Sequence, residues 1–283
     1  MNEIIENLSI GGERPWYASE GITLRNVHVT DGESALKECR DITVQDSLFD
    51  GKYPFWHDRN ALVERCRLTV DARAPFWYSH DMTLRDCDVA APKPFREMDD
   101  LRMENCRITG SVEALWRCRG VALKNTQTSG EYLFFSSSDL DLDHVRHDGK
   151  YSFQYVRGGV IRNSVLNTKD AFWHASDLTV YDSEIKGEYL GWYSKNLRLV
   201  RCRISGTQPL CYCENLILED CQMEEDADLA FEYSSVQATV LTPISSVKNP
   251  LTGFIKAPTI GEIILDEHLR APADCRIQTW ENA

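Results

Sequence analysis

A pattern of about twenty residues recurs along the chain and limits its possible folds more than any other feature. Each copy begins with Gly, Asp or Asn, continues with two apolar residues separated by one variable residue, and ends with Asn or Asp, a small residue and another apolar residue. We call the first apolar residue of each copy the anchor. The anchors lie 19 to 21 residues apart, at Ile22, Ile42, Ala61, Met82, Leu101, Val121, Leu140, Gly159, Leu178, Leu197, Leu216 and Val236. A fixed period of this length indicates a repeat architecture.

The residues around each anchor alternate between apolar and variable, which is typical of a half-buried strand. The position two after the anchor is apolar from Leu24 to Leu218, and the position five after it is small. No segment has the 3.6-residue apolar spacing of a long helix. Two short strands and a third apolar stretch make one coil. The sequence therefore predicts an all-β fold, a single-stranded right-handed parallel β-helix (solenoid) of about 12 coils.

Further columns describe the core and the corners of each coil. Six residues before the anchor we expect a stacked core column, whose members include Phe55, Phe76, Phe95, Leu115, Phe134, Phe153 and Phe172. The residue before the anchor is nearly always Gly, Asp or Asn, and the residue four after it is often Asn or Asp. These types favour bends, because their side chains satisfy nearby backbone groups. We expect a corner at each of the two positions.

The repeat fades after Val236. Residues 237–283 contain four prolines, and only the segment from Ile263 to Leu265 resembles another rung. A solenoid needs capped ends, because its last rung otherwise exposes apolar surface and a strand edge. We therefore expect one domain, in which residues 1–236 form the β-helix with an N-terminal cap at Met1 to Trp16. Residues 237–283 are expected to form the last irregular coil and the C-terminal cap.

Composition excludes several classes of partner. The chain has 31 basic and 44 acidic residues, giving a formal charge of -13, which disfavours nucleic acid and anionic membranes. It contains no apolar run of about 18 residues that could span a membrane. The ten cysteines are not accompanied by a secretion signal, so we expect a cytoplasmic protein with reduced thiols. Cys211 and Cys213 do not have zinc-site spacing and no phosphate loop is present, so we expect neither a metal nor a cofactor.

Five segments carry a resemblance to a known family: Gly12 to Arg14, Gly32 to Lys37, Lys52 to Trp56, Glu188 to Trp192 and Ala230 to Ser234. With them the chain resembles a bacterial family of uncharacterised proteins grouped with the pectin-lyase-like right-handed β-helices. The resemblance covers essentially the whole chain and implies the same fold. Pectin-lyase-like folds host polysaccharide lyases, glycoside hydrolases and esterases. The resemblance assigns no catalytic residue, since a shared fold does not fix an activity.

Aromatic residues gather in columns that alternation turns outward. Five before the anchor lie Tyr17, Trp56, Trp77, Trp116, Phe135, Trp173, Trp192 and Phe231; four before it lie His57, Tyr78, His174, Tyr193 and Tyr212; eight before it lie Tyr53, Tyr132, Tyr151 and Tyr189. A long exposed aromatic strip marks a binding surface or a surface covered by a partner. The residues predicted to bind a substrate are Trp56, Trp77, Trp116, Tyr151, Trp173, His174, Tyr189 and Trp192.

Charged residues border this strip nine positions before the anchor, at Glu131, Lys150, Lys169 and Glu188, with Asp170 beside Lys169. Asp170 and Glu188 fall on adjacent coils, so their carboxyl groups can approach to roughly 5–6 Å, near the separation in retaining glycosidases. Lys169, Asp170 and Glu188 are therefore the candidate catalytic residues. In the alternative interpretation these charges form only a surface ladder of ion pairs.

Two functions remain open from the sequence. In the first, the aromatic strip binds or cleaves an oligosaccharide, as a glycoside hydrolase or lyase would. In the second, the protein is a non-catalytic interaction scaffold, and the strip is the contact with a second copy of the chain or with another protein. The sequence does not decide whether the protein is an enzyme.

Overall fold

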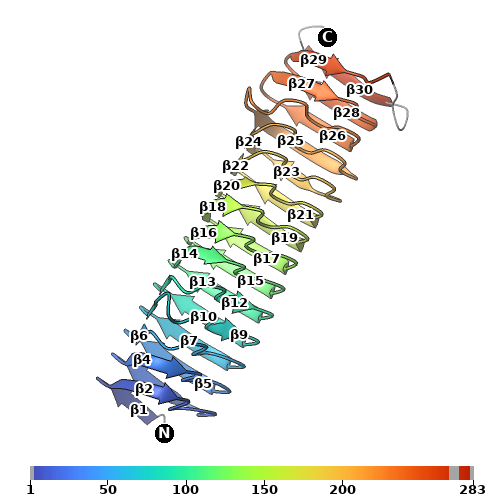
Figure 1. The fold of residues 1–283 in the computed structure, drawn as a ribbon. Helices are drawn as coiled ribbons and strands as arrows, with labels where there is room; N and C mark the ends of the chain where they lie inside the picture. The colour runs from blue at the N-terminus through green and yellow to red at the C-terminus, as the bar shows by residue number, and fades with distance from the viewer. Residues whose placement is uncertain (1–2, 268–273, 281–283) are drawn as a thin grey trace. The chain divides into compact units, whose positions relative to one another are not determined.

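A computed structural model describes residues 3–267 and 274–280, and these residues form parallel strands without any α-helix (Figure 1). The fold is the predicted all-β parallel solenoid, and the described part of the chain makes about 14 turns. The chain divides into two compact units, residues 1–146 and residues 147–283. Parts of the two predicted caps, residues 1–2, 268–273 and 281–283, lie outside the described residues.

In the first unit, each coil contributes one strand to each of two parallel ladders. The anchor ladder contains β1 (Glu3–Glu6), β3 (Ile22–Arg25), β5 (Arg40–Gln45), β7 (Arg59–Glu64), β10 (His80–Arg85), β13 (Asp99–Glu104), β15 (Arg119–Lys124) and β17 (Ser138–Asp143). The second ladder contains β2 (Ser9–Glu13), β4 (His28–Glu33), β6 (Leu48–Phe49), β8 (Arg67–Leu68), β11 (Asp88–Val89), β14 (Arg107–Val112) and β16 (Gln127–Glu131). A third, shorter pair joins β9 (Phe76–Trp77) to β12 (Phe95–Arg96).

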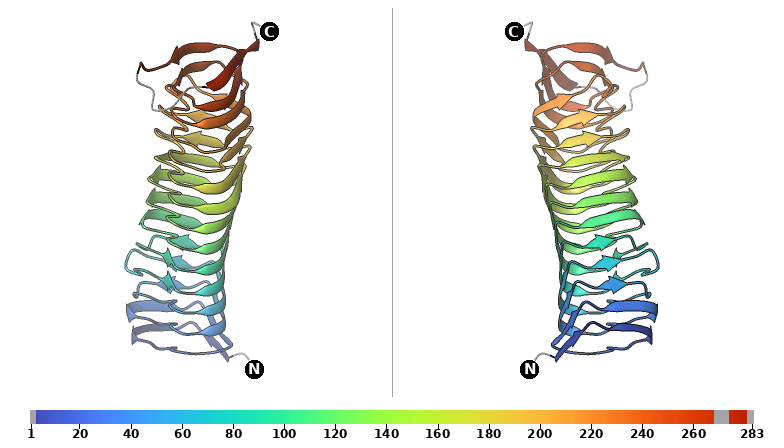
Figure 2. Two further views of the ribbon diagram at one scale, coloured as in Figure 1. Left: turned by 90° about the vertical axis from the view of Figure 1, so that its right-hand side faces the viewer. Right: turned by 90° about the vertical axis from the view of Figure 1, so that its left-hand side faces the viewer.

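The second unit repeats this arrangement. Its anchor ladder contains β19 (Arg157–Arg162), β21 (Ser176–Tyr181), β23 (Arg198–Val200), β25 (Leu216–Met223), β26 (Ser235–Val240), β28 (Thr252–Ala257) and β30 (Asp274–Thr279). The second ladder contains β18 (Arg146–Lys150), β20 (Val165–Lys169), β22 (Glu184–Lys186) and β24 (Arg203–Ser205), and the end of β25 continues it. A separate pair joins β27 (Ile244–Lys248) to β29 (Ile260–Ile264). Within each unit, strands of successive coils lie side by side in both views of Figure 2.

Both ends of the chain are more regular than the repeat indicates. At the start, β1 and β2 already form a rung, since they pair in parallel with β3 and β4. After Val236, β28 and β30 extend the anchor ladder, although neither carries the repeated pattern. The rung expected near Ile263 is present as β29. Backbone pairing therefore continues where the side-chain pattern has faded, because ladder hydrogen bonds do not depend on side-chain identity.

The predicted core columns are buried. Leu24, Val44 and Val63, two positions after their anchors, are fully buried and occupy the same place on successive coils. In the first unit, the ring of Phe76 stacks between the rings of Phe55 and Phe95, with centroid distances of 4.8 and 5.0 Å. The seven members of this column, six of them phenylalanines, are fully buried. Aromatic packing of this kind adds to the energy of apolar burial.

Both predicted corners adopt the left-handed backbone conformation. Asp41, before its anchor, has φ of 52°, and Asp46, four after the anchor, also has φ of 52°. Asn and Asp tolerate this region better than other non-glycine residues. Their side chains also bond along the stack: the Asn60 amide donates to Asp41 Oδ1 at 2.5 Å, and the Asn26 amide donates to Asn7 Oδ1 at 2.7 Å. The repeated Asn and Asp therefore set the bend and join adjacent coils.

The small inward column is filled by thiols in five coils. All ten cysteines are free, and Cys66, Cys87, Cys106, Cys202 and Cys221 of this column are buried. Each of the five thiols lies within hydrogen-bonding distance of a backbone carbonyl of the preceding coil, such as Val44 for Cys66 at 3.6 Å. These thiols act as small core residues that also satisfy a carbonyl group.

Candidate functional site

The aromatic residues of the second unit form a ladder of stacked rings. We call it the tyrosine ladder, and its members are Tyr155, His174, Tyr193, Tyr212 and Tyr233. Successive ring centroids are 4.9, 5.1, 4.8 and 5.9 Å apart, and the first three pairs are within 13° of parallel. Each coil contributes one ring, so the spacing follows the separation of neighbouring strands.

Two tryptophans run beside this ladder. The indoles of Trp173 and Trp192 stack at 5.5 Å with an interplanar angle of 5°. Each indole N–H donates a hydrogen bond to a carbonyl of the next coil: Trp173 to Tyr189 and Trp192 to Gln208, both at 2.7 Å. The two rings are therefore held in place before any ligand arrives. Together with Tyr189, which meets Trp192 edge to face at 5.3 Å, they and the tyrosine ladder make up the aromatic face of the second unit.

The local backbone explains why this face is aromatic on the outside. Asp170, Phe172 and His174 all have φ between 54° and 60°, so left-handed residues alternate along this segment. Phe172 points into the core and is fully buried, whereas Trp173 is half-buried and His174 is exposed. Bulky residues adopt positive φ only when the surrounding structure holds them there. Here the stacked rings and the inter-coil backbone hydrogen bond from His174 to Trp192, at 2.9 Å, provide that support.

The rings stack on one another, so their faces are largely occupied and their edges point outward. The side chains of Tyr155 and Tyr193 are 43% and 46% exposed. The structure offers a row of ring edges with the polar tips of Tyr and His, which suit hydrogen bonding as well as apolar contact.

The three candidate catalytic residues lie at the border of this face. Lys169 Nζ is 2.9 Å from Glu188 Oε2, and the same ammonium lies 5.0 Å from the centre of the Tyr189 ring. The hydrogen bond to Glu188 is the main cause that raises the pKa of Lys169. The ion pair expected in the alternative interpretation is thus present, and it holds the Glu188 side chain beside the aromatic face.

Asp170 differs from its charged neighbours because it is buried. Only 6% of the residue is exposed, and Oδ1 has no hydrogen-bond partner among the described residues. Burial is the main cause that raises the pKa of this carboxyl group, and the negative charge of Glu188 adds to the effect while Lys169 opposes it. A carboxyl group in such surroundings holds its proton more strongly than an exposed one. The site therefore places a buried carboxyl group of raised pKa directly after Lys169, which forms the ion pair with Glu188.

The aromatic residues predicted in the first unit form a second, interrupted column. Trp56 and Trp77 stack at 5.4 Å, and Trp116 stacks with Phe135 at 4.8 Å. Between the two pairs lies Arg96, whose guanidinium is 4.6 Å from the ring of Trp77 and 5.1 Å from that of Trp116. A search for aromatic residues misses Arg96, although it occupies the same position, five before its anchor. Cation–π contact explains why an arginine fits this column.

The predicted strip is wrong at Phe231. This residue is fully buried, whereas its place five before Val236 predicted an outward position. This coil has one residue fewer between the buried ring and its anchor, so the inward position is five before the anchor instead of six. Tyr233 takes the outer place and stacks on Tyr212. Tyr155 and Tyr233 are members of the ladder that the sequence columns leave out, and their positions relative to buried Phe153 and Phe231 would have identified them.

A buried carboxyl group in the first unit was also missed. Asp58 is fully buried; its Oδ1 accepts a hydrogen bond from the Cys39 backbone N–H at 2.8 Å, and its Oδ2 has no partner among the described residues. In the next coil Ser79 holds the equivalent place and accepts the N–H of Asp58 at 3.0 Å. Burial is the main cause that raises the pKa of Asp58 to about 9. The equivalent position in the other coils is mostly Ser or Cys, so the sequence pattern did not indicate a buried carboxyl group at this one Asp.

Asp58 predicts a dependence of stability on pH. Its pKa rises from the ordinary value of 3.8 to about 9 in the folded state, so between these values the folded state holds one proton that the unfolded state has lost. Stability therefore falls as pH rises from 5 to 8, by at most about 1.4 kcal/mol per pH unit. Asp58→Asn, which cannot ionise, is expected to remove this contribution. Urea unfolding midpoints of both proteins at pH 5 and pH 8 measure it, and an equal pH dependence in both would contradict it.

Among residues 3–267 and 274–280, no group of three or more His, Cys, Asp or Glu side chains could hold a metal ion. The described part of the chain also contains no helix long and apolar enough to cross a membrane.

Comparison with known proteins gives a family and several structures of similar fold. The described fold is similar to the A-module of mannuronan C-5 epimerase AlgE6 from Azotobacter vinelandii, at 10% identity and a TM-score of 0.43, covering 98% of this chain and 90% of that chain. It is also similar to the surface protein and adhesin PfbA of Streptococcus pneumoniae, at 10% identity and a TM-score of 0.39, covering 92% of this chain and 77% of that chain.

A third similar structure is the tailspike protein of the E. coli bacteriophage HK620, in complex with a pentasaccharide, at 9% identity and a TM-score of 0.39, covering 97% of this chain and 72% of that chain. No curated protein matches the sequence. A family model described as "Protein of unknown function (DUF3737)" matches residues 3–278. Since the match spans nearly the whole sequence, the resemblance seen in the sequence segments is confirmed, and the chain belongs to this family of proteins of unknown function.

Proposed function

We propose that the aromatic face of the second unit binds an oligosaccharide that is neutral or weakly charged. The observation that carries this proposal is the row of exposed ring edges beside a buried carboxyl group and a fixed ion pair. A sugar presents both C–H groups and hydroxyls, so it needs apolar edges and hydrogen-bonding groups within the same surface. Tyr193 and His174 supply apolar ring edges that also carry polar tips. Lys169 and Glu188 supply hydrogen-bond donors and acceptors at the border of the face. The net charge of -13 disfavours a polyanionic ligand.

The proposal extends to hydrolysis through the same border residues. Cleavage of a glycosidic bond uses one carboxylic acid, which protonates the leaving oxygen, and one carboxylate, which acts as nucleophile or activates water. Asp170 suits the first role, because burial raises the pKa of its carboxyl group. Glu188, paired with Lys169, suits the second. We assign Lys169 the task of positioning Glu188.

A glycan array tests the binding step. We expect the purified protein to bind one class of oligosaccharide, and Tyr193→Ala to weaken that binding roughly 2- to 10-fold, the range for loss of one aromatic contact. Tyr17→Ala is the matched control, since Tyr17 is 51% exposed and lies in the first unit. Asp170→Asn should keep binding and remove any hydrolysis of the bound glycan. Absence of binding to every glycan, or unchanged binding by Tyr193→Ala, would contradict the proposal.

The scaffold function has one observation in its favour. The exposed rings are mainly tyrosines, and tyrosine is enriched at protein–protein interfaces. If a second copy of the chain covers the tyrosine ladder, light scattering will show a dimer in the wild type and a monomer in Tyr193→Ala. A monomeric wild type at all concentrations tested would exclude this form of the scaffold.

A further inference from the structure

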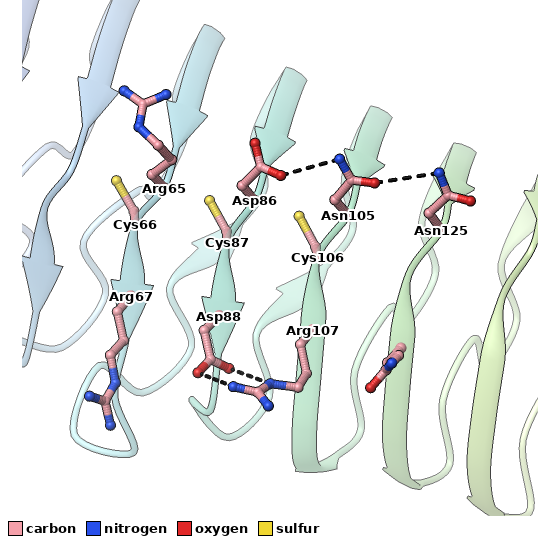
Figure 3. A pocket seen from close by; sticks show the side chains of 11 residues that line it. Arg65, Cys66, Arg67, Asp86, Cys87, Asp88, Asn105, Cys106, Arg107 and Asn125 are labelled. Atoms are coloured by element: carbon pink, nitrogen blue, oxygen red, sulfur yellow. Dashed lines mark hydrogen bonds and ion pairs between the residues drawn. The ribbon is translucent and has the colours of Figure 1, made fainter.

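Buried thiols lie one above another in the small inward column of each unit. In the first unit, Cys66, Cys87 and Cys106 occupy the same place on three successive coils, and their side chains point the same way (Figure 3). The thiol of Cys87 is hydrogen-bonded to both of its neighbours. The repeat therefore brings thiols of adjacent coils into contact, and the proposed function uses none of them.

The second unit contains the simpler case, a stack of two thiols. Cys202 lies between β23 and β24, and Cys221 lies in β25. The strands are in register, as the adjacent pair Arg203 and Gln222 shows, so the two cysteines lie opposite each other. Equivalent Cα atoms on neighbouring strands are about 4.8 Å apart, within the roughly 4.4–6.8 Å that a disulfide spans. The two thiols are also hydrogen-bonded to each other.

The two thiols of this pair differ in acidity. The hydrogen bond from Cys221 is the main cause that lowers the pKa of Cys202, although burial opposes it. The same hydrogen bond, together with burial, raises the pKa of Cys221. The thiolate is the form of cysteine that reacts with oxidants. Cys202 is therefore the thiol that reacts first, and Cys221 is the thiol placed to attack the product.

Burial decides which oxidants reach the pair. Cys202 and Cys221 are 1% and 0% exposed, so an oxidant must be small and must enter while the coil is open. The strands on either side of Cys202, β23 and β24, have three residues each, so few ladder hydrogen bonds hold this coil closed. Hydrogen peroxide is small enough to enter, and closing of the coil returns the two sulfurs to contact.

We propose that Cys202 and Cys221 form a disulfide when the protein meets a hydroperoxide, and that this bond joins the two coils covalently. The Cys202 thiolate attacks one oxygen of the hydroperoxide, the O–O bond breaks, and the departing oxygen takes up a proton. The product at Cys202 is a sulfenic acid. The Cys221 sulfur then attacks the Cys202 sulfur, the S–O bond breaks, and the hydroxyl leaves as water with the Cys221 thiol proton. The two thiols together lose two electrons, which reduce the hydroperoxide.

Hydrogen peroxide treatment of the folded, fully reduced protein tests the first step. Mass spectrometry of non-reduced peptides should show the peptides of Cys202 and Cys221 joined, with two hydrogen atoms lost. In Cys221→Ser the sulfenic acid has no thiol to attack it, so dimedone should label Cys202 there. Serine fits this position, because other coils have a buried serine in the same column, namely Ser47, Ser164 and Ser183.

Cys213→Ser is the matched control. Cys213 is a buried thiol of the same coil as Cys221, but serines hold the places on either side of it: Ser194 donates to its sulfur at 3.3 Å, and Ser234 accepts its backbone N–H at 2.8 Å. It therefore meets the same oxidant without a thiol partner in its stack. Cys213→Ser should form the disulfide between Cys202 and Cys221 as the wild type does.

Thermal unfolding tests the effect on the two coils. A disulfide restricts the unfolded chain, so oxidation should raise the unfolding midpoint. The measurement uses Cys87→Ser, which removes the thiol contacts of the first-unit stack, and compares it with Cys87→Ser combined with Cys221→Ser. Oxidation should raise the midpoint of the first variant and leave that of the second unchanged.

Four results would overturn the proposal: Cys202 and Cys221 both reduced after peroxide treatment, Cys202 oxidised without a bond to Cys221, dimedone labelling of Cys213 as strong as that of Cys202 in Cys221→Ser, or an unfolding midpoint of Cys87→Ser that oxidation does not raise. Peroxide treatment in urea provides the reference, because an unfolded chain should give mixed pairings. The same mixture from the folded protein would show that the stack does not direct the reaction.

Discussion

Phe76→Ala is expected to lower the free energy of unfolding by about 3–5 kcal/mol, the range for truncating a buried phenylalanine. Phe76 is fully buried and its ring lies between two other rings, at 4.8 Å from Phe55 and 5.0 Å from Phe95. Removing it opens a cavity and ends two stacking contacts at once. Phe76→Leu should cost less, because leucine fills part of the same space. Urea unfolding followed by circular dichroism measures the difference.

Val70→Ala is the matched control for this change. Val70 lies six residues before Phe76 but is 65% exposed, so its truncation should alter stability by no more than about 0.5 kcal/mol. If Phe76→Ala were no more destabilising than Val70→Ala, the phenylalanine column would not be a main source of stability in the first unit.

Gly130→Ala is expected to destabilise the protein by about 3 kcal/mol or more, through the backbone rather than the core. Gly130 has φ of 144°, which L-residues with a side chain rarely adopt. A Cβ atom at this position would lie 1.7 Å from the Ser111 carbonyl oxygen of the preceding coil. The two coils would have to move apart, which breaks the parallel pairing of β14 with β16.

Gly110→Ala separates this steric effect from the general loss of a glycine. Gly110 also has positive φ, at 61°, but a Cβ atom there would meet nothing within 4 Å. Gly110→Ala should therefore lower the free energy of unfolding by only roughly 1–2 kcal/mol, which is the cost of an alanine in the left-handed conformation. Thermal unfolding of the two variants, measured side by side, gives the comparison. Equal losses would show that contact with Ser111 contributes nothing.

The sequence repeat was sufficient to predict the solenoid, its buried phenylalanine column and its left-handed corners. These features follow from the period alone, because residues similar to Phe76, Asp41 and Asp46 occupy equivalent positions in other coils. Arg96 and Asp58 could not be predicted in the same way. Each occupies a position where the other coils have a different residue type, and only the neighbouring rings or backbone groups reveal why it fits. Phe231 was misplaced because its coil has one residue fewer between the buried ring and the anchor, which shifts the inward position.

The candidate site was predicted in part for a related reason. The sequence columns indicate that Trp173, Trp192 and His174 share one side of the chain, and the ring contacts bear this out. They do not indicate that the rings stack face to face, since the direction of a side chain in a bend depends on φ. The sequence columns also do not distinguish Lys169, Asp170 and Glu188 from one another, since all three follow the pattern of surface charges. Burial distinguishes Asp170 from the other two, and burial depends on packing between coils.

The five buried thiols of the small inward column offer a way to follow the opening of individual coils. A thiol reagent can reach Cys66, Cys87 or Cys106 only when the strand above it detaches, because each is buried and lies against the preceding coil. The rate of alkylation at each position would then report a local opening equilibrium. Mass spectrometry of the labelled peptides would give a map of opening energies along each unit. Cys202 and Cys221 would supply the same record for the second unit.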